Sequence, residues 1–295
     1  MANLRDIRKR RRSAGNTRKI TRTMELVASA KLKKAQDAAA ASRPYAEALL
    51  EMVGNLSGGL THPLMKTRPV SSVVIVVSAA DRGLCGSFNT NLVDLAIKRG
   101  DHHLRQGREV EYLCIGKKAV STLAFLGREV AASHAGIAGK PQLAKVTPIA
   151  NGLMDDFLAA KVDLVEVVYA RFVSASRQVP DQLVLLPAGA ADAHASVSGV
   201  RPAARHAVRN LDFITIPSPE ELVEVIIPTM VRTVLYSAVL QTTAGEHSAR
   251  RIAMKNASDA AGDMVKSLTT VYNRGRQGKI TQEIAEIVGA VEAMA

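Results

Sequence analysis

The stretch "VSSVVIVVSAADRGLCGSFN", residues 70–89, decides the fold of this chain. Its first half is a continuous run of apolar, mostly β-branched residues, which is typical of a strand buried on both faces of a sheet. Its second half is rich in glycine and predicts a tight turn that leads from the strand into a helix. A strand, a turn and a helix in direct succession indicate an α/β domain.

The chain that follows repeats this alternation. Helices are predicted over 88–107 and 117–127, with a further helix that ends near Val162. Strands are predicted at "EVEYLCIG" (109–116), "DLVEVVYARFVSA" (163–175) and "QLVLLP" (182–187). We therefore expect a Rossmann-like α/β domain of mainly parallel sheet over residues 70–210, with a small, polar and mobile loop at 188–207.

A long helix is predicted on each side of this domain, over residues 1–56 and 219–295. Good helix formers dominate both, with no proline before Pro44 in the first and none after Pro228 in the second. At about 1.5 Å per residue they would span on the order of 80 Å and 115 Å, far beyond a compact domain. The sequence therefore predicts a long antiparallel coiled coil of the two terminal helices, with the α/β domain as its insert.

The second helix would extend beyond the first by about 24 residues, which is the stretch "VYNRGRQGKITQEIAEIVGAVEAMA" at 271–295. Its apolar residues form one stripe at helical spacing: Ile280, Ile284, Ile287, Val288 and Val291. The opposite face is expected to meet the first helix and consists of Met264, Leu268, Val271, Gly275 and Gly278. The alternative is a helix that breaks at "NRGRQG", since each interior glycine costs about 1 kcal/mol.

The net charge of +12 is concentrated in one segment. Residues 1–34 hold twelve Lys and Arg against Asp6 and Glu25, whereas the rest of the chain is nearly balanced. Such a segment favours a polyanionic partner: nucleic acid, anionic lipid or an acidic protein surface. A basic helical nucleic-acid-binding protein is therefore one alternative, although the aromatic content of 3% offers few residues for base stacking.

The remaining composition argues against several other classes. A content of 47% apolar residues is that of a globular protein, and no run of about 20 apolar residues predicts a membrane span. Cys85 and Cys114 form no CxxC, which predicts buried thiols rather than a metal cluster or a disulfide framework. His102 and His103 lie on a polar helix end and are expected to be solvated. The Arg-rich start could be taken for a transit peptide.

No stretch of the sequence predicts catalysis. "DRGLCG" lacks the GxxxxGK[ST] pattern of a phosphate-binding loop, and Asp81 would repel phosphate. A stand-alone Rossmann-like enzyme is a second alternative, but it has no cofactor fingerprint here. We therefore predict no catalytic, cofactor-binding or metal site.

Three stretches together closely resemble the gamma subunit family of F-type ATP synthase. They are "NTRKITRTMELVASAKLKKAQ" (16–36), "DRGLCGSFN" (81–89) and "EHSARRIAMKNASDAAGDMVKSLTTVYNRGRQGKITQEIAEIVGA" (246–290). The resemblance covers essentially the whole chain in the right order. It begins within a few residues of Met1, which suggests that no transit peptide precedes it.

The resemblance implies a non-catalytic rotor shaft, one per complex, which couples ion flow to ATP synthesis or hydrolysis. The two helices would stand inside three alpha and three beta subunits, with the apolar stripe at 280–291 as a bearing in an apolar sleeve. The α/β domain would contact the epsilon subunit and the membrane c-ring. The complex would lie peripherally at the cytoplasmic face of a bacterial inner membrane.

The resemblance also implies which residues contact a beta subunit. The family's contacts to an acidic beta-subunit loop fall on Arg274, Arg276, Gln277 and Thr281, with neighbouring acidic positions at Glu283 and Glu286. Arg8, Lys9 and Met24 fall in the segment alongside. The alternative is that these residues form a solvated helix face. Ile216 replaces a carboxylate that is frequent in the family, so a c-ring contact there is expected not to be ionic.

Overall fold

The computed structural model describes residues 4–56, 62–139, 141–188 and 218–294. The chain divides into two compact units, which we name the helix-pair unit (Met1–Ala28 with Arg251–Ala295) and the α/β unit (Ser29–Arg250). Both long helices contribute to both units, so the sequence ranges 1–56, 70–210 and 219–295 stay a prediction of domain organisation. Residues 189–207 of the predicted loop, and Ile216, lie outside the described residues.

The two long helices are α1 (Leu4–Leu56) and α6 (Pro219–Met294), as the sequence predicts. Helix α6 continues without interruption through "NRGRQG", so the alternative of a break at this point is wrong. Gly275 has a packing reason, because a Cβ atom at this position would lie only 3.0 Å from Cδ2 of Leu4. This glycine therefore allows close approach of the two helices, which offsets its low helix propensity.

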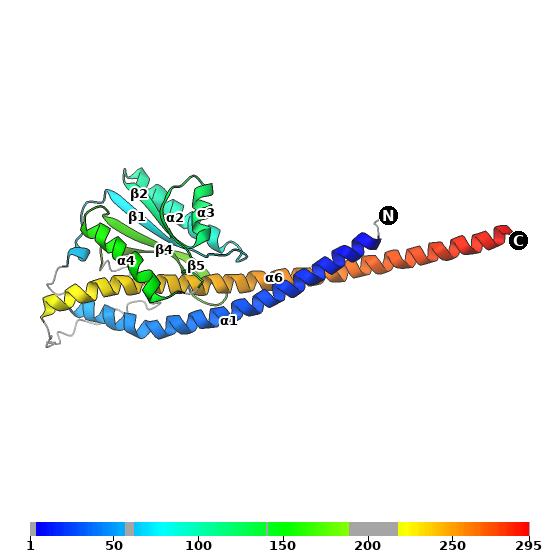
Figure 1. Cartoon of the computed structure of the whole chain (residues 1–295), viewed down its shortest axis with the longest axis horizontal. Coiled ribbons are helices and arrows are strands. Elements are labelled where there is room, and N and C mark those ends of the chain that lie inside the picture. The colour runs from blue at the N-terminus through cyan, green and yellow to red at the C-terminus, as the bar shows by residue number, and fades with distance from the viewer. Residues whose placement is uncertain (1–3, 57–61, 140, 189–217, 295) are drawn as a thin grey trace. The chain divides into compact units, whose positions relative to one another are not determined.

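The α/β unit contains one five-stranded sheet in the order β3-β2-β1-β4-β5 (Figure 1). Strands β1 to β4 pair in parallel, and β5 pairs antiparallel with β4. The bounds are Ser72–Ser78, Glu109–Ile115, Val130–His134, Leu164–Phe172 and Gln178–Leu186. The prediction of a mainly parallel sheet is confirmed. Strand β3 was not predicted from sequence, because "VAASH" is short and weakly apolar, and its residues alternate between half-buried and exposed.

Helices cover both faces of the sheet, which explains the apolar run at 73–77. Val73, Ile75 and Val77 face the layer of α2 (Phe88–Arg105) and α3 (Lys117–Phe125). Val74 and Val76 face the layer of α4 (Leu143–Leu158) and the first part of α6. Figure 1 shows α2 and α3 on one side of the sheet and α4 on the other. A central strand buried on both faces has no polar side, so its sequence reads as continuous rather than alternating.

One prediction about this unit is wrong. His103 is 2% exposed rather than solvated, with Nε2 3.3 Å from Oε1 of Glu166 and Nδ1 2.9 Å from Nη1 of Arg108. Burial lowers the pKa of His103, which favours the neutral ring. The residue follows Leu92 and Ala96 on the buried face of α2 at helical spacing, whereas its neighbour His102 is exposed.

One described helix, α6, is long and apolar enough to pass a test for membrane crossing by length and composition. The mean hydropathy of its most apolar window is 1.6, and half of that window is buried inside the protein. The core helix of a globular domain passes the same test. Val231, Leu235 and Val239 of α6 belong to the hydrophobic core on one face of the sheet.

Candidate functional site

Helix α6 lies across the carboxyl ends of the parallel strands. Its residue Thr242 accepts a hydrogen bond from the backbone N–H of Ala170 at the end of β4, at 3.1 Å. Thr243 donates one to the carbonyl oxygen of Ala138 at 2.8 Å. Arg250 donates to the carbonyl oxygens of Arg82 and Gly83, which follow β1, at 3.2 Å each.

These contacts fall where open α/β sheets bind ligands. The chain runs from β1 towards β2 on one side and reaches β4 on the other, so the topological switch point lies between β1 and β4. In this protein the side chains of α6 occupy the carboxyl edge at that point. The α/β unit therefore uses its crevice to hold a helix.

A buried charged cluster strengthens these contacts of α6. Arg250 and Glu246 form an ion pair of 2.7 Å with side chains 11% and 4% exposed. Burial raises the pKa of Glu246, whose Oε2 has no hydrogen-bond partner among the described residues. Burial, together with the positive charges of Arg250 and Lys31, lowers the pKa of His247 to about 4. The imidazole of His247 is therefore neutral and lies beside the guanidinium of Arg250, which is paired with Glu246.

Both thiols belong to the core of the α/β unit. Cys85 and Cys114 are buried free cysteines, as predicted. Burial raises the pKa of Cys85, and it raises the pKa of Cys114 to about 12. Because the thiolate is the reactive form, both groups are held in the unreactive state.

The helix-pair unit is an antiparallel pair with a seven-residue repeat. On α1 the residues at every seventh position are each less than a tenth exposed: Ile7, Ala14, Thr21 and Ala28. On α6 one series of buried or half-buried residues follows the alternating spacing of four and three: Met254, Ser258, Ala261, Val265, Leu268 and Tyr272. This repeat is the signature of a coiled coil, so that part of the predicted fold is confirmed.

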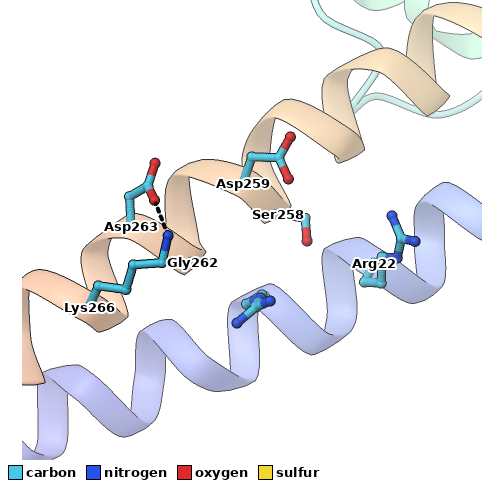
Figure 2. Close-up of a pocket in the computed structure, with 7 residues that line it drawn as sticks. Arg22, Ser258, Asp259, Gly262, Asp263 and Lys266 are labelled. Atoms are coloured by element: carbon cyan, nitrogen blue, oxygen red, sulfur yellow. Dashed lines mark hydrogen bonds and ion pairs between the residues drawn. The ribbon is translucent and has the colours of Figure 1, made fainter.

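The middle of the seam between these helices contains small and polar residues, among them Ala14, Thr21, Ser258, Ala261 and Gly262. Gly262 lies against Arg18, since a Cβ atom at position 262 would be in ordinary contact with Nε of Arg18 at 3.5 Å. Beside it lies a groove of about 460 Å³ lined by Arg18 and Arg22 of α1 and by polar residues of α6. Figure 2 shows Ser258 pointing towards α1, with the ion pair of Asp263 and Lys266 next to it. Small seam residues allow close approach but bury little apolar area.

This seam corrects the sequence-based assignment of the face that meets α1. Met264 and Val271 were expected to lie in it, but they are 57% and 49% exposed. Of the predicted set, Gly275 faces Leu4 of α1 and Leu268 is half-buried, whereas Gly278 is exposed and a Cβ atom there would meet no neighbour within 4 Å. The prediction placed these residues on one face by an ideal rotation of 100° per residue, whereas the seam of α6 follows a spacing of four and three, which leaves Met264 and Val271 outside it.

A single aromatic residue links the two helices near the start of α1. Arg8 donates a hydrogen bond from Nη2 to the Tyr272 hydroxyl oxygen at 2.7 Å. The guanidinium carbons of Arg8 and Arg11 lie 5.6 Å and 5.0 Å from the centre of the Tyr272 ring. The hydrogen bond from Arg8 and the nearby positive charges lower the pKa of Tyr272.

Beyond Gly275 the side chains of α6 are solvent-exposed as far as the structure describes them. The stripe residues Ile280, Ile284, Ile287, Val288 and Val291 are 44–65% exposed. Arg274, Gln277 and Thr281 are exposed on the same segment. The two acidic positions have partners within the helix, since Glu283 pairs with Lys279 at 3.4 Å and Glu286 accepts a hydrogen bond from Gln282 at 2.9 Å.

No group of three or more His, Cys, Asp or Glu side chains is placed to hold a metal ion in the part of the chain that the structure describes. The end of α6 combines exposed apolar side chains with exposed basic ones. These features are suited to binding protein partners.

Comparison with known proteins decides the family. The chain matches the ATP synthase family over residues 3–294. It is 39% identical to an ATP synthase gamma chain of Leptospira biflexa, with all of both chains covered. It is 40% identical to an ATP synthase gamma chain of Gemmatimonas aurantiaca, covering all of this chain and 99% of that relative. This chain belongs to the ATP synthase gamma chain family.

Solved structures of lower identity have the same fold as this gamma-chain family member. One is a chain of the Euglena gracilis mitochondrial ATP synthase, with a TM-score of 0.63 and 17% identity over 99% of this chain and 94% of that chain. Another is a chain of the Tetrahymena thermophila mitochondrial ATP synthase, from a structure of the central stalk and c-ring. It has a TM-score of 0.59 and 23% identity, and covers 81% of this chain and 99% of that one.

Membership in the gamma-chain family decides between the functions that the sequence left open, the nucleic-acid-binding protein and the stand-alone enzyme among them. The basic residues Arg8 and Lys9 are exposed, and Met24 is partly buried. Arg8 already donates a hydrogen bond within the helix pair, which the family resemblance does not indicate. The beta-subunit contacts assigned to these positions stay predictions.

Sequence reasoning about a gamma chain missed two features that the structure reveals. One is the set of hydrogen bonds that Arg250 donates to the turn after β1, and the other is the contact of Tyr272 with Arg8 and Arg11. The spacing of seven residues in the series Ile7, Ala14, Thr21 and Ala28 was a detectable signal for the seam. The contacts of Arg250 had no such signal, because they join residues more than 160 positions apart.

Proposed function

We propose that this gamma-family chain is the non-catalytic rotor shaft of an F-type ATP synthase, one copy per complex. The helix pair stands inside three alpha and three beta subunits, and the α/β unit contacts the epsilon subunit and the membrane c-ring. Rotation presents different faces of the shaft to each beta subunit and so drives its affinity for nucleotides through a cycle. The complex sits peripherally on the cytoplasmic face of a bacterial inner membrane.

The exposed end of α6 carries this proposal. Five large apolar side chains, 44–65% exposed, form a stripe on a helix that is continuous to Met294. A large exposed apolar stripe on a folded protein marks an interaction site. Apolar contact is non-directional and tolerates rotation, so the stripe is suited to a bearing.

Arg276 and Gln277 supply directional contacts on the same segment. Their exposed side chains are available for charge-assisted hydrogen bonds to an acidic loop of a beta subunit. The proposed contact is completed by neighbouring side chains on the same segment. These are Arg274, Thr281, Glu283, which pairs with Lys279, and Glu286, which accepts a hydrogen bond from Gln282. We name the group Arg274, Arg276, Gln277 and Thr281 the latch.

The experiment is reconstitution of the full chain with alpha and beta subunits, with ATP hydrolysis as the measurement. The wild-type complex should hydrolyse ATP, and this chain alone should not. Arg276→Ala with Gln277→Ala should lower turnover by roughly tenfold or more, since a charge-assisted hydrogen bond contributes about 1.5–3 kcal/mol. Assembly yield should change little.

The matched control removes the same kinds of group elsewhere on α6. Lys255→Ala with Asn256→Ala deletes one exposed base and one exposed amide, and turnover should stay within about twofold. Unchanged turnover of the Arg276 and Gln277 variant would contradict the assignment of the latch. Failure of the wild-type chain to assemble with alpha and beta subunits would contradict the proposal that this chain is the shaft.

A further inference from the structure

The charged residues in the seam of the helix-pair unit do not follow the pattern of a stability-driven coiled coil. Three successive seam positions of α1, at alternating spacing with the buried ones, are charged: Arg11, Arg18 and Glu25. The opposing residues of α6 include Gly262 and Tyr272. Polar residues in a coiled-coil seam lower stability but specify register.

Tyr272 is the only aromatic residue in the two sequence segments of this unit. Two arginines of α1, one turn apart, engage it in two ways: Arg8 bonds its hydroxyl at 2.7 Å, and Arg8 and Arg11 lie over its ring. A shift of one residue moves a helical side chain by about 1.5 Å along the axis and 100° around it. Such a shift would break the hydrogen bond and misplace both guanidinium groups together.

The position of this contact along α6 links it to the latch. Tyr272 precedes Arg274 by two residues and Arg276 by one helical turn. The approach of Leu4 to Gly275 is a cross-helix contact that lies still nearer the exposed end. The setting of Tyr272 against α1 therefore fixes the direction in which the latch side chains leave the helix pair.

We propose that Arg8, Arg11 and Tyr272 form a register lock, which holds α1 and α6 in one axial and rotational setting and thereby positions the latch. This inference rests on the proposed shaft function. Tyr272 is a positioning residue that acts through Arg276 and Gln277. Arg8 contributes by holding Tyr272.

The first measurement is a distance between spin labels in the full chain, assembled with alpha and beta subunits. Ser13→Cys and Ser267→Cys place the labels on exposed positions of α1 and α6. Cys85 and Cys114 are buried, so labelling is selective. Wild-type Tyr272 should give one narrow distance distribution, and Tyr272→Leu should broaden it.

The second measurement is ATP hydrolysis by the same complexes. Tyr272→Leu should lower turnover about five- to tenfold, because without the cation–π contacts and the hydrogen bond the latch residues lose their single setting. Tyr272→Phe keeps the ring and should recover most of the turnover, to within about twofold of wild type. Arg11→Gln should fall between them, whereas its matched control Arg12→Gln, at an exposed position, should match wild type within about twofold.

A combined variant tests the link to the latch. With Arg276 and Gln277 already replaced by Ala, Tyr272→Leu should cause little further loss, because the lock acts through those residues. A full additional loss would overturn positioning, and so would a broadened distance distribution with unchanged turnover. An unchanged narrow distribution in Tyr272→Leu would overturn the lock. If the wild-type chain fails to assemble, the shaft proposal fails, and the label distances in the full chain alone still test the lock.

Discussion

The two units of this protein use the same helix in opposite ways. In the α/β unit, residues 242–248 of α6 are all buried and are held by hydrogen bonds to β4 and to the loop that follows β3. In the helix-pair unit, residues 273–291 of the same helix are all exposed. The first part belongs to the core of a domain, and the second part is exposed to solvent. Local stability should therefore differ greatly along one continuous helix.

The largest expected difference is in hydrogen exchange of the chain alone. Backbone amides at 242–248 should exchange at least about a thousandfold more slowly than those at 280–290, because an unsupported helix is marginal in water. Exchange measured by mass spectrometry on overlapping peptides would show it. Similar protection of both segments would mean that the exposed end is stable without partners. Addition of alpha and beta subunits should slow exchange at 280–290 and leave 242–248 unchanged.

Two ion pairs of equal spacing on α6 provide a sharper comparison. Glu246 and Arg250 are nearly buried, whereas Lys279 and Glu283 are 65% and 57% exposed. Arg250→Leu should lower the free energy of unfolding by about 3–5 kcal/mol, because it leaves a buried carboxylate unpaired. Lys279→Leu should change it by less than about 0.5 kcal/mol.

Urea denaturation followed by circular dichroism measures both variants. The double variant Arg250→Leu with Glu246→Gln should recover part of the loss, since it removes the unpaired charge. Equal effects of Arg250→Leu and Lys279→Leu would contradict the difference between the two regions.

His247 makes the stability of the α/β unit depend on pH. Its pKa is lowered from 6.5 to about 4 in the folded protein, so the folded state binds fewer protons than the unfolded state between these values. The stabilisation is present above about pH 6.5 and is lost as the pH falls towards 4. From pH 7 to pH 5 the wild type should lose about 1–2 kcal/mol more than His247→Asn, which cannot titrate.

The neighbouring carboxylate acts in the opposite direction. The pKa of Glu246 is raised, so its contribution is largest at low pH and declines as the pH rises through its folded value. The difference between wild type and His247→Asn isolates the imidazole from this effect. Parallel stability–pH curves for the two proteins would show that His247 binds protons equally in both states.

The smallest effect on the chain alone should follow removal of the exposed apolar stripe. A chain that ends after Glu283 loses Ile284, Ile287, Val288 and Val291, which are 56–65% exposed. Its unfolding free energy should change by less than about 0.5 kcal/mol. In the complex with alpha and beta subunits it should still assemble and rotate, with weaker cohesion and lower torque.

The control for this truncation is a chain that ends before Val271. That chain also loses Arg274, Arg276, Gln277 and Thr281, so coupled ATP synthesis should fall much further. Loss of all rotation in the chain that ends after Glu283 would mean that the stripe itself transmits torque. This result would contradict the role of the stripe as a bearing.

Local sequence was sufficient where one segment satisfies its own requirements. The run at 73–77 indicates a strand buried on both faces, and the strand lies at the centre of a mainly parallel sheet. Helix propensity predicted α1 and α6 almost to their ends. The edge strand β3 was missed because "VAASH" carries neither a buried run nor a clear alternation of apolar and polar residues.

The candidate contact surface was only partly readable from sequence. The stripe at 280–291 follows from helical spacing, and the structure leaves it exposed. Met264 and Val271 were assigned to the seam by ideal helical spacing, yet the seam uses Ser258, Ala261 and Gly262. His103 was judged by its polar neighbours, although its position on α2 faces Glu166.

The sequence by itself determined the succession of helices and strands, the parallel sheet and the apolar stripe, because propensity and periodicity are properties of neighbouring residues. Tertiary structure alone decided that α6 occupies the ligand crevice of the sheet, through Thr242 and Arg250. It also decided that Arg8 and Arg11 engage Tyr272, more than 260 residues away. Such contacts depend on which side chains the folded backbone brings within about 4–6 Å, and no local pattern carries that distance.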